Sequence, residues 1–104
     1  MTKINILYIS PNKYNSNEVL ELINANESWH GFVANNEEEA VLLFLEFNMA
    51  MILFGCDVNK KTEIKLCHYF KEINPTIIIL EPYGGGTGLL THEIISAFNK
   101  DESL

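Results

Sequence analysis

The stretch from Asn35 to Asp57 constrains the fold most, because in it a helix pattern runs directly into a strand pattern. Asn36 can cap the helix with its side chain while Glu39 reaches back toward it, and acidic residues in the first turn suit the positive end of the helix dipole. The run 49–54 that follows is short and apolar throughout, as in a strand covered on both faces. The stretch therefore predicts a helix that leads the chain into the middle of a parallel sheet.

Three further runs have strand character, and they cover residues 3–9, 29–34 and 76–80. Gly31 weakens the second of these strands, which favours a position at an edge of the sheet. We expect Glu81-Pro82-Tyr83 to leave the sheet after the last strand.

Three further helices are predicted from caps, breakers and apolar spacing. The first begins at a cap on Ser16 or Asn17, the second opens after residues 59–62 and ends at Asn74-Pro75, and the third covers 89–99. Apolar residues at helical spacing mark the faces that should point into the core. In the helix of the Asn35–Asp57 stretch these residues are Ala40, Leu43, Phe44 and Phe47, and in the helix that begins at Ser16 or Asn17 they are Val19, Leu20 and Ile23. In the helix after residues 59–62 they are Ile64, Cys67, His68 or Tyr69, and Ile73, and in the helix at 89–99 they are Leu90, Ile94, Ile95 and Phe98.

Alternating strands and helices imply a parallel sheet with right-handed crossovers. We predict an α/β domain with an open, flavodoxin-like sheet of four parallel strands in the order 2-1-3-4 and helices on both faces. In such a sheet the carboxyl ends of the first and third strands flank a crevice, where ligands usually bind. Residues 1–100 are expected to form this single domain, with a frayed tail at 101–104.

Charge and apolar patterning exclude several classes of function. With 7 Lys and Arg against 14 Asp and Glu, the net charge of −7 argues against direct nucleic-acid binding. Residues 40–56 are too short for a bilayer and include Glu46, so no membrane role is predicted, and the first residues lack signal-peptide features, which favours the cytoplasm. Neither Cys56 and Cys67 nor the three histidines have metal-ligand spacing, and no cofactor is predicted.

The run from Ala34 to Phe54, with a helix ending at Asn74-Pro75 and a strand at 77–80, resembles the receiver domains of two-component response regulators. The resemblance covers roughly the first 80 residues and rests on the pattern and length of the elements. It implies a receiver-like fold and a role in signal transduction. Receivers accept a phosphoryl group on an aspartate, next to acidic residues that hold a magnesium ion.

The residues that support phosphorylation in receivers are replaced at each matching position. Ser10 and Pro11 stand in place of the acidic pair, Gly55 in place of the phosphoryl-accepting aspartate, and Glu81 in place of a Ser or Thr. A fifth strand with its Lys-Pro pair has no counterpart, and Ser10 can offer a metal only a weak neutral ligand. The resemblance therefore implies a degenerate pseudo-receiver that is not an enzyme. Asp57 is interpreted as a turn or cap residue, the alternative being a displaced nucleophile.

A fainter similarity is to the IIB domains of sugar phosphotransferase systems, which carry a phosphorylated cysteine directly after the first strand. Ser10 occupies that position here, and Cys56 follows a different strand. A phosphotransfer enzyme would have to use Cys56 or Asp57, so this similarity also implies an inert domain.

A glycine-rich run precedes the last predicted helix. Its backbone N–H groups could face an anion, but the run matches neither the P-loop nor the dinucleotide fingerprint, and Glu81 beside it would repel an anion. We prefer a connector that replaces a helix and strand of a full receiver. If a ligand does bind, the residues expected to line its site are Ser10, Asn12, Gly55, Asp57, Glu81, Gly84, Gly85, Gly86, Thr87 and Gly88.

Two functions remain open from the sequence. The first is a non-catalytic signalling or regulatory domain that acts by binding an unidentified protein partner, and the alternative is a small-molecule or anion sensor that uses the crevice and the glycine-rich run. A homodimer is also predicted, because Ile77, Ile78, Ile79 and Leu80 form an edge strand with no blocking residue before Pro82. The alternative is that the glycine-rich run and the helix from Leu89 fold over this edge. Two copies would pair these strands or pack the neighbouring helices across the two-fold axis.

Overall fold

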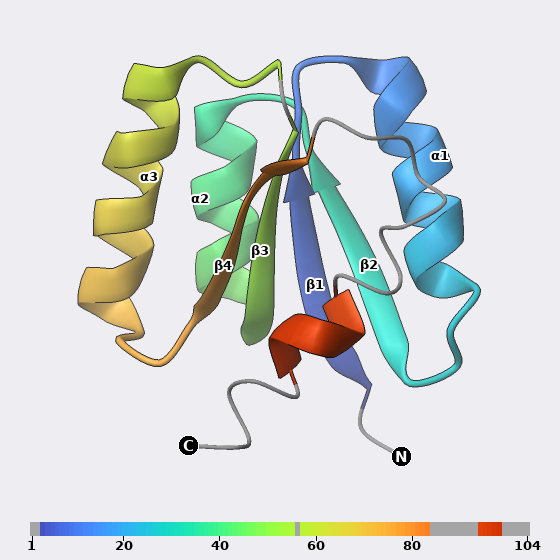
Figure 1. Cartoon of the computed structure of the whole chain (residues 1–104). Coiled ribbons are helices and arrows are strands. Elements are labelled where there is room, and N and C mark those ends of the chain that lie inside the picture. Colours follow the sequence, from blue (N-terminus) through green and yellow to red (C-terminus); the bar gives the residue numbers. More distant parts are fainter. Residues whose placement is uncertain (1–2, 56, 84–93, 99–104) are drawn as a thin grey trace.

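The protein is described by a computed structural model for residues 3–55, 57–83 and 94–98. Within these ranges strands and helices alternate, and residues 94–98 form a further helical segment (Figure 1). The elements are β1 (Ile4–Ile9), α1 (Lys13–Asn24), β2 (Trp29–Ala34), α2 (Glu37–Glu46), β3 (Met49–Gly55), α3 (Lys60–Ile73) and β4 (Ile78–Tyr83). All strand pairs are parallel and the order is β2-β1-β3-β4, which confirms the predicted fold class and strand order.

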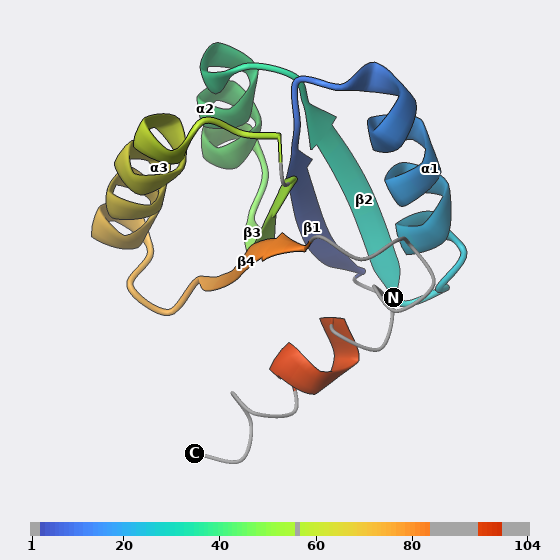
Figure 2. The same ribbon diagram turned by 45° about the horizontal axis from the view of Figure 1, so that its top comes forward.

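The sheet has a hydrophobic core on each face. α2 and α3 cover one face, where the rings of Phe44 and Phe70 lie 4.4 Å apart. α1 and residues 94–98 cover the other face, where Ile23 and Ile94 are fully buried. Figure 2 shows α2 and α3 on one side of the sheet and the 94–98 segment on the other. Because side chains alternate along a strand, β1 and β3 supply both cores.

An extra residue in β3 sets which of its side chains reach each core. Asn5 pairs with Met49 and Ile6 pairs with Met51, so Ala50 has no counterpart in β1. Met49 consequently faces the α2–α3 side, whereas Met51, two residues later, faces the α1 side. The unbroken apolar run predicted for this strand is used by both cores.

The expectation that Glu81-Pro82-Tyr83 leaves the sheet is wrong. β4 begins at Ile78, later than predicted, and continues to Tyr83. The register between β3 and β4 shifts just before Gly55 pairs with Tyr83, so β4 carries an extra residue there. Such an irregularity accommodates Pro82, which has no N–H to donate to the ladder.

The cap predicted for α1 is also wrong. The helix begins at Lys13, so residues 13–15, expected in a loop, are helical. Ser16 lies within the first turn, and its hydroxyl donates to the backbone carbonyl of Asn12 at 2.8 Å. A hydroxyl that binds the carbonyl four residues behind it satisfies no N–H at the helix end, which is why Ser16 does not act as a cap.

The N-terminus of α2 has the predicted cap. The side chain of Asn36 accepts the backbone N–H of Glu39 at 2.8 Å. The carboxylate of Glu39 accepts the N–H of Asn35 at 2.8 Å, one residue before its expected partner. The reciprocal arrangement satisfies two backbone donors at a helix end that would otherwise rely on water.

The predicted inward face of α3 is partly wrong. Leu66 and Phe70 are buried, whereas Ile64 and Ile73 are 59% and 49% exposed. The helix is rotated so that Phe70 reaches Phe44 of α2, and its neighbour one turn earlier, Leu66, points inward with it. Packing between aromatic rings therefore decides the rotation that apolar spacing left ambiguous.

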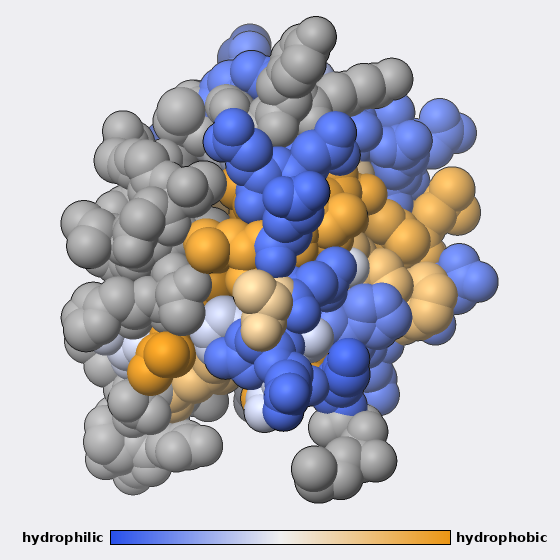
Figure 3. All heavy atoms as spheres, turned by 90° about the vertical axis from the view of Figure 1, so that its right-hand side faces the viewer, coloured by the Kyte–Doolittle hydropathy of each residue, from blue (hydrophilic) through white to orange (hydrophobic). Residues whose placement is uncertain are grey.

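Two other predicted core residues reach the surface. Phe47, the C-cap of α2, is 38% exposed and packs against Phe32, and Ile95 is 42% exposed while its neighbour Ile94 is buried. Seen from the α1 side, hydrophobic side chains show between hydrophilic ones across the middle of the face and toward its right-hand edge (Figure 3).

Among the described helices, none has the length and apolar character needed to cross a bilayer.

Candidate functional site

The carboxyl ends of β1 and β3 lie side by side at the same end of the sheet, because the two strands are parallel and adjacent in its middle (Figure 1). We call this the carboxyl end of the sheet. Ser10 follows β1 directly, and Gly55 is the last residue of β3. Asp57 lies two positions beyond Gly55. The topology thus brings together residues that are far apart in the sequence, at the place where open α/β sheets bind ligands.

A hydrogen bond joins Ser10 to Asp57 at the carboxyl end of the sheet. The Ser10 hydroxyl donates toward both carboxylate oxygens, at 2.9 Å to Oδ1 and 3.1 Å to Oδ2. The same hydroxyl accepts the backbone N–H of Asn12 at 3.1 Å. Ser10 is fully buried, whereas Asp57 is exposed. The one hydroxyl proton and an oxygen lone pair of Ser10 are therefore both engaged within the chain.

Asn35 fixes the backbone of this site, a role that the sequence did not indicate. Its side-chain amide donates to the carbonyl of Ser10 at 2.8 Å and to the hydroxyl of Ser16 at 3.2 Å. The N–H of Ser10 donates to the carbonyl of Ala34 at 3.0 Å. These bonds tie the turn after β1 to the end of β2 and to α1. The sequence signals for Asn35 are its polar side chain and its position directly after β2.

Gly55 is required by space at this site. A Cβ atom at this position would lie 2.8 Å from Asp57 Oδ1, 2.8 Å from Tyr8 Oη and 3.0 Å from Ser10 Cβ. The backbone of Gly55 has no positive φ, so the constraint is close approach and not conformation. An aspartate at this position would have to displace Asp57 and the buried Tyr8 ring.

The residues at the carboxyl end of the sheet do not fit the magnesium site of a receiver. Such a site relies on several hard oxygen ligands, usually carboxylates. Asp57 supplies one carboxylate, and no group of three His, Cys, Asp or Glu residues that could hold a metal ion exists in residues 3–55, 57–83 and 94–98. The Ser10 hydroxyl donates its proton to Asp57 and is a neutral group, so it adds no charged ligand.

The candidate ligand residues divide into those that the structure brings together and those it does not describe. Ser10, Asn12, Gly55 and Asp57 lie together at the carboxyl end of the sheet, and their role as ligand residues stays a prediction. Glu81 lies in β4, but its side chain is outside the described part of the structure, as are all five residues of the glycine-rich run 84–88. The negative charge of Asp57 opposes an anion here, so the described residues add no support to the anion-sensor alternative.

Of the predicted interface residues, Ile78, Ile79 and Leu80 lie on β4, the outermost strand of the described sheet, and Ile77 directly precedes it. Ile77 is buried, and Ile78, Ile79 and Leu80 are half-buried because they pack into the two cores. Within the described residues, no strand pairs with the outer main-chain edge of β4, and the side chains of Ile78, Ile79 and Leu80 are partly covered.

This fold and this position of the site define a receiver-like α/β domain, and comparison with solved structures gives the same class. Similar structures include a response regulator receiver domain protein from Clostridium thermocellum, 19% identical with a TM-score of 0.64. Another is HP1043, an orphan response regulator of H. pylori, 20% identical with a TM-score of 0.64. Each alignment covers 92% of this chain and 75% of the other, and at these identities it shows the fold alone. No protein-family model and no curated protein matches the sequence.

Proposed function

We propose that this chain is a receiver-like signalling or regulatory domain that takes no phosphoryl group at the usual position and acts by binding a protein partner. The observation that carries the proposal is the hydrogen bond between Ser10 and Asp57 beside Gly55. This hydrogen bond lies at the carboxyl end of the sheet, where the resemblance to receivers places the acidic pair and the phosphoryl-accepting aspartate.

The chemistry of phosphoryl transfer supports this proposal. A carboxylate that attacks a phosphorus atom needs positive charge beside it, from a metal ion or a cationic side chain, to offset the charge that develops. The side-chain donor to Asp57 is the neutral hydroxyl of Ser10. Within the described ranges no Lys forms an ion pair with Asp57. Such an arrangement favours a fixed carboxylate over a reactive one.

Incubation with acetyl phosphate and magnesium tests the chemical half of the proposal. The intact mass is expected to stay unchanged, both for the unmodified protein and for the Asp57→Asn variant, which serves as the control. A stoichiometric phosphoryl adduct that is lost in Asp57→Asn would refute the pseudo-receiver assignment. Such a result would identify Asp57 as a displaced acceptor.

Self-association through β4 is the second part of the proposal. Its support is the position of β4 at an end of the described sheet, and the irregularity at Pro82 limits strand pairing to residues before it. Light scattering at micromolar concentration should show a dimer that Ile78→Lys converts to a monomer, with circular dichroism to verify that the variant is folded. A monomeric unmodified protein, or a dimer that tolerates Ile78→Lys, would count against this edge as the interface.

A further inference from the structure

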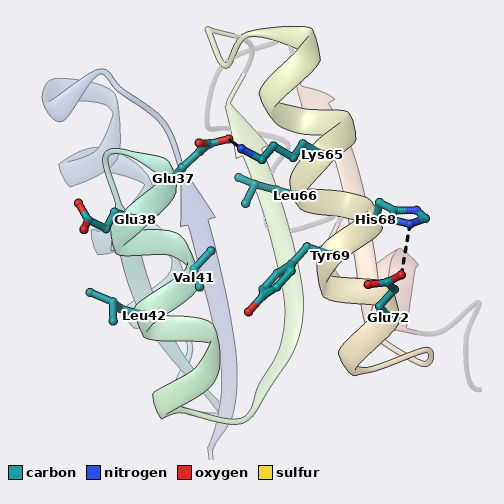
Figure 4. A pocket seen from close by; sticks show the side chains of 9 residues that line it. All are labelled: Glu37, Glu38, Val41, Leu42, Lys65, Leu66, His68, Tyr69 and Glu72. Atoms are coloured by element: carbon teal, nitrogen blue, oxygen red, sulfur yellow. Dashed lines mark ion pairs between the residues drawn. The ribbon is translucent and has the colours of Figure 1, made fainter.

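A groove of about 620 Å³ lies between α2 and α3 on the side of these helices that faces away from the sheet (Figure 4). Nine side chains, four from α2 and five from α3, surround it. They are Glu37, Glu38, Val41, Leu42, Lys65, Leu66, His68, Tyr69 and Glu72. We refer to it as the α2–α3 groove.

The interior of the α2–α3 groove is apolar. Leu66 is buried, and Val41 and Tyr69 are half-buried between the two helices. In Figure 4, Leu66 and Tyr69 extend from α3 toward α2. Leu42 on the rim is 61% exposed, which leaves most of its apolar surface in contact with water. Covering this surface would be favourable by roughly 25 cal/mol for each Å² of apolar area removed from water.

The charged residues around the groove carry an excess of negative charge. Glu37 pairs with Lys65 at 3.4 Å, and Glu72 lies 3.4 Å from His68, which is charged only when protonated. Glu38 forms no ion pair with any residue in the described part of the chain. The lining therefore contains three carboxylates, one lysine and one histidine, and a partner that brings positive charge to Glu38 would be complementary.

The length of the groove matches the spacing of side chains on a helix. On α3 the lining runs from Lys65 to Glu72, seven residue steps, or about 10 Å at ~1.5 Å per residue. Anchors at positions i, i+3 or i+4, and i+7 of a helix span the same distance, and this pattern is how amphipathic helices bind apolar grooves.

We propose that the α2–α3 groove binds an amphipathic helix from a protein partner, with apolar anchors over Val41, Leu66 and Tyr69 and a lysine or arginine beside Glu38. This assignment rests on the proposed function, because it names the surface through which the domain would act. It places the partner on the face opposite α1, on a groove that neither Ser10 nor Asp57 lines.

A fluorescent model peptide of about 15 residues, built from leucine and lysine with leucine on one helical face, is the probe. Fluorescence anisotropy should show saturable binding to the intact protein with one peptide for each chain. A peptide of the same composition in scrambled order, and one with glutamate in place of lysine, should bind about tenfold more weakly or not at all. These two controls separate the shape of the probe from its charge.

Two pairs of protein variants locate the binding site. Glu38→Lys and Glu46→Lys change the net charge equally on exposed positions of α2, but only Glu38 lines the groove. Leu42→Ser and Ile64→Ser remove leucine-sized side chains that are 61% and 59% exposed, and only Leu42 lines the groove. Glu38→Lys and Leu42→Ser should each weaken binding about tenfold, or ~1.4 kcal/mol, while Glu46→Lys and Ile64→Ser should leave it within about twofold.

Three results would overturn the proposal. They are no binding of the leucine–lysine peptide at millimolar concentration, equal losses from the groove variants and their controls, and a dimer that Leu42→Ser dissociates, which would make a second copy the occupant. None of these results bears on phosphorylation, because neither Ser10 nor Asp57 lines the groove. A failure here is thus distinguishable from a phosphoryl adduct at Asp57, which would refute the proposed function itself.

Discussion

The two faces of the sheet are built differently. On one face α2 and α3 lie side by side, each at least ten residues long, and contribute the aromatic pair Phe44 and Phe70. On the other face α1 lies close to β2, and residues 94–98 also pack against the sheet, with Ile94 fully buried. Among the described residues, the first face has two helices with a groove between them, whereas the second has α1 and the helical residues 94–98.

On the α2–α3 face, the same two helices supply both a core and an outward groove. Side chains from α2 and α3 that point inward form the larger aromatic cluster, while their outward sides leave Leu42 and Tyr69 in contact with the groove. On the α1 face the close approach of helix and strand leaves less room between elements, as the contacts at Gly31 show. We therefore expect substitutions in the α2–α3 core to cost most, and the following variants test that ordering.

The largest effect is expected for Phe70→Ala. Phe70 is fully buried and stacks on Phe44, so its removal leaves a large cavity and should lower the free energy of unfolding by about 3–5 kcal/mol. Urea denaturation followed by circular dichroism measures this loss. Such a change is comparable with the total stability of a small domain, ~5–15 kcal/mol, and the variant should be close to unfolding at room temperature.

Ile94→Ala is the matched change on the other face. It also removes a fully buried side chain, but the removed volume is smaller and the expected loss is near the lower end of about 2–5 kcal/mol. A loss as large as that of Phe70→Ala would mean that the two faces contribute equally, contrary to the comparison above.

The next effect concerns the close packing of α1 on β2. A Cβ atom on Gly31 would lie 3.0 Å from Leu20 Cδ1 and 3.1 Å from Ile23 Cγ2, so Gly31→Val should destabilise the protein by about 1–3 kcal/mol through overpacking. The double variant Gly31→Val, Leu20→Ala should lose less than the sum of the two single changes, because the shorter residue makes room. Thermal unfolding that shows simple additivity would indicate that α1 moves away instead.

A smaller effect is expected at the start of α2. Asn36→Ala removes the acceptor for the N–H of Glu39 and should cost about 1 kcal/mol, whereas Asn36→Ser keeps an acceptor and should cost only a few tenths. Thermal unfolding of the two variants checks the difference. Equal losses would show that the loop around Asn35 holds the helix end without this cap.

The sequence predicted the parallel sheet and the capped start of α2 because these follow from local signals. The alternation of apolar strands and amphipathic helices determines a parallel sheet, and Asn36 with Glu39 is a cap signature in any context. The rotation of α3 and the course of β4 through Pro82 could not be predicted in the same way. Each depends on contacts with a distant element, Phe44 in the first case and β3 in the second.

The candidate site was predictable in part. Strand topology is enough to bring Ser10 near Gly55 and Asp57, and the structure places them together. The identity of the hydrogen bond, the engagement of Asn35 and the lack of space at Gly55 depend on side-chain positions within a fraction of an ångström. The α2–α3 groove was missed because Leu42, Tyr69 and Lys65 come from two helices whose facing sides are set only by packing.

The smallest effect is expected for the ion pair between Glu37 and Lys65 across the α2–α3 groove. Its atoms are 3.4 Å apart, but the side chains are 40% and 72% exposed, so water and salt screen the attraction. A double-mutant cycle with Glu37→Gln and Lys65→Met should give a coupling energy of about 0.2–1 kcal/mol that declines as salt is added. The His68–Glu72 pair within α3 is the reference, because it is similarly exposed but joins no second helix. A Glu37–Lys65 coupling well above 1 kcal/mol that persists in high salt would show that this pair holds the two helices together, and the α2–α3 face would then depend on a surface contact as well as on Phe44 and Phe70.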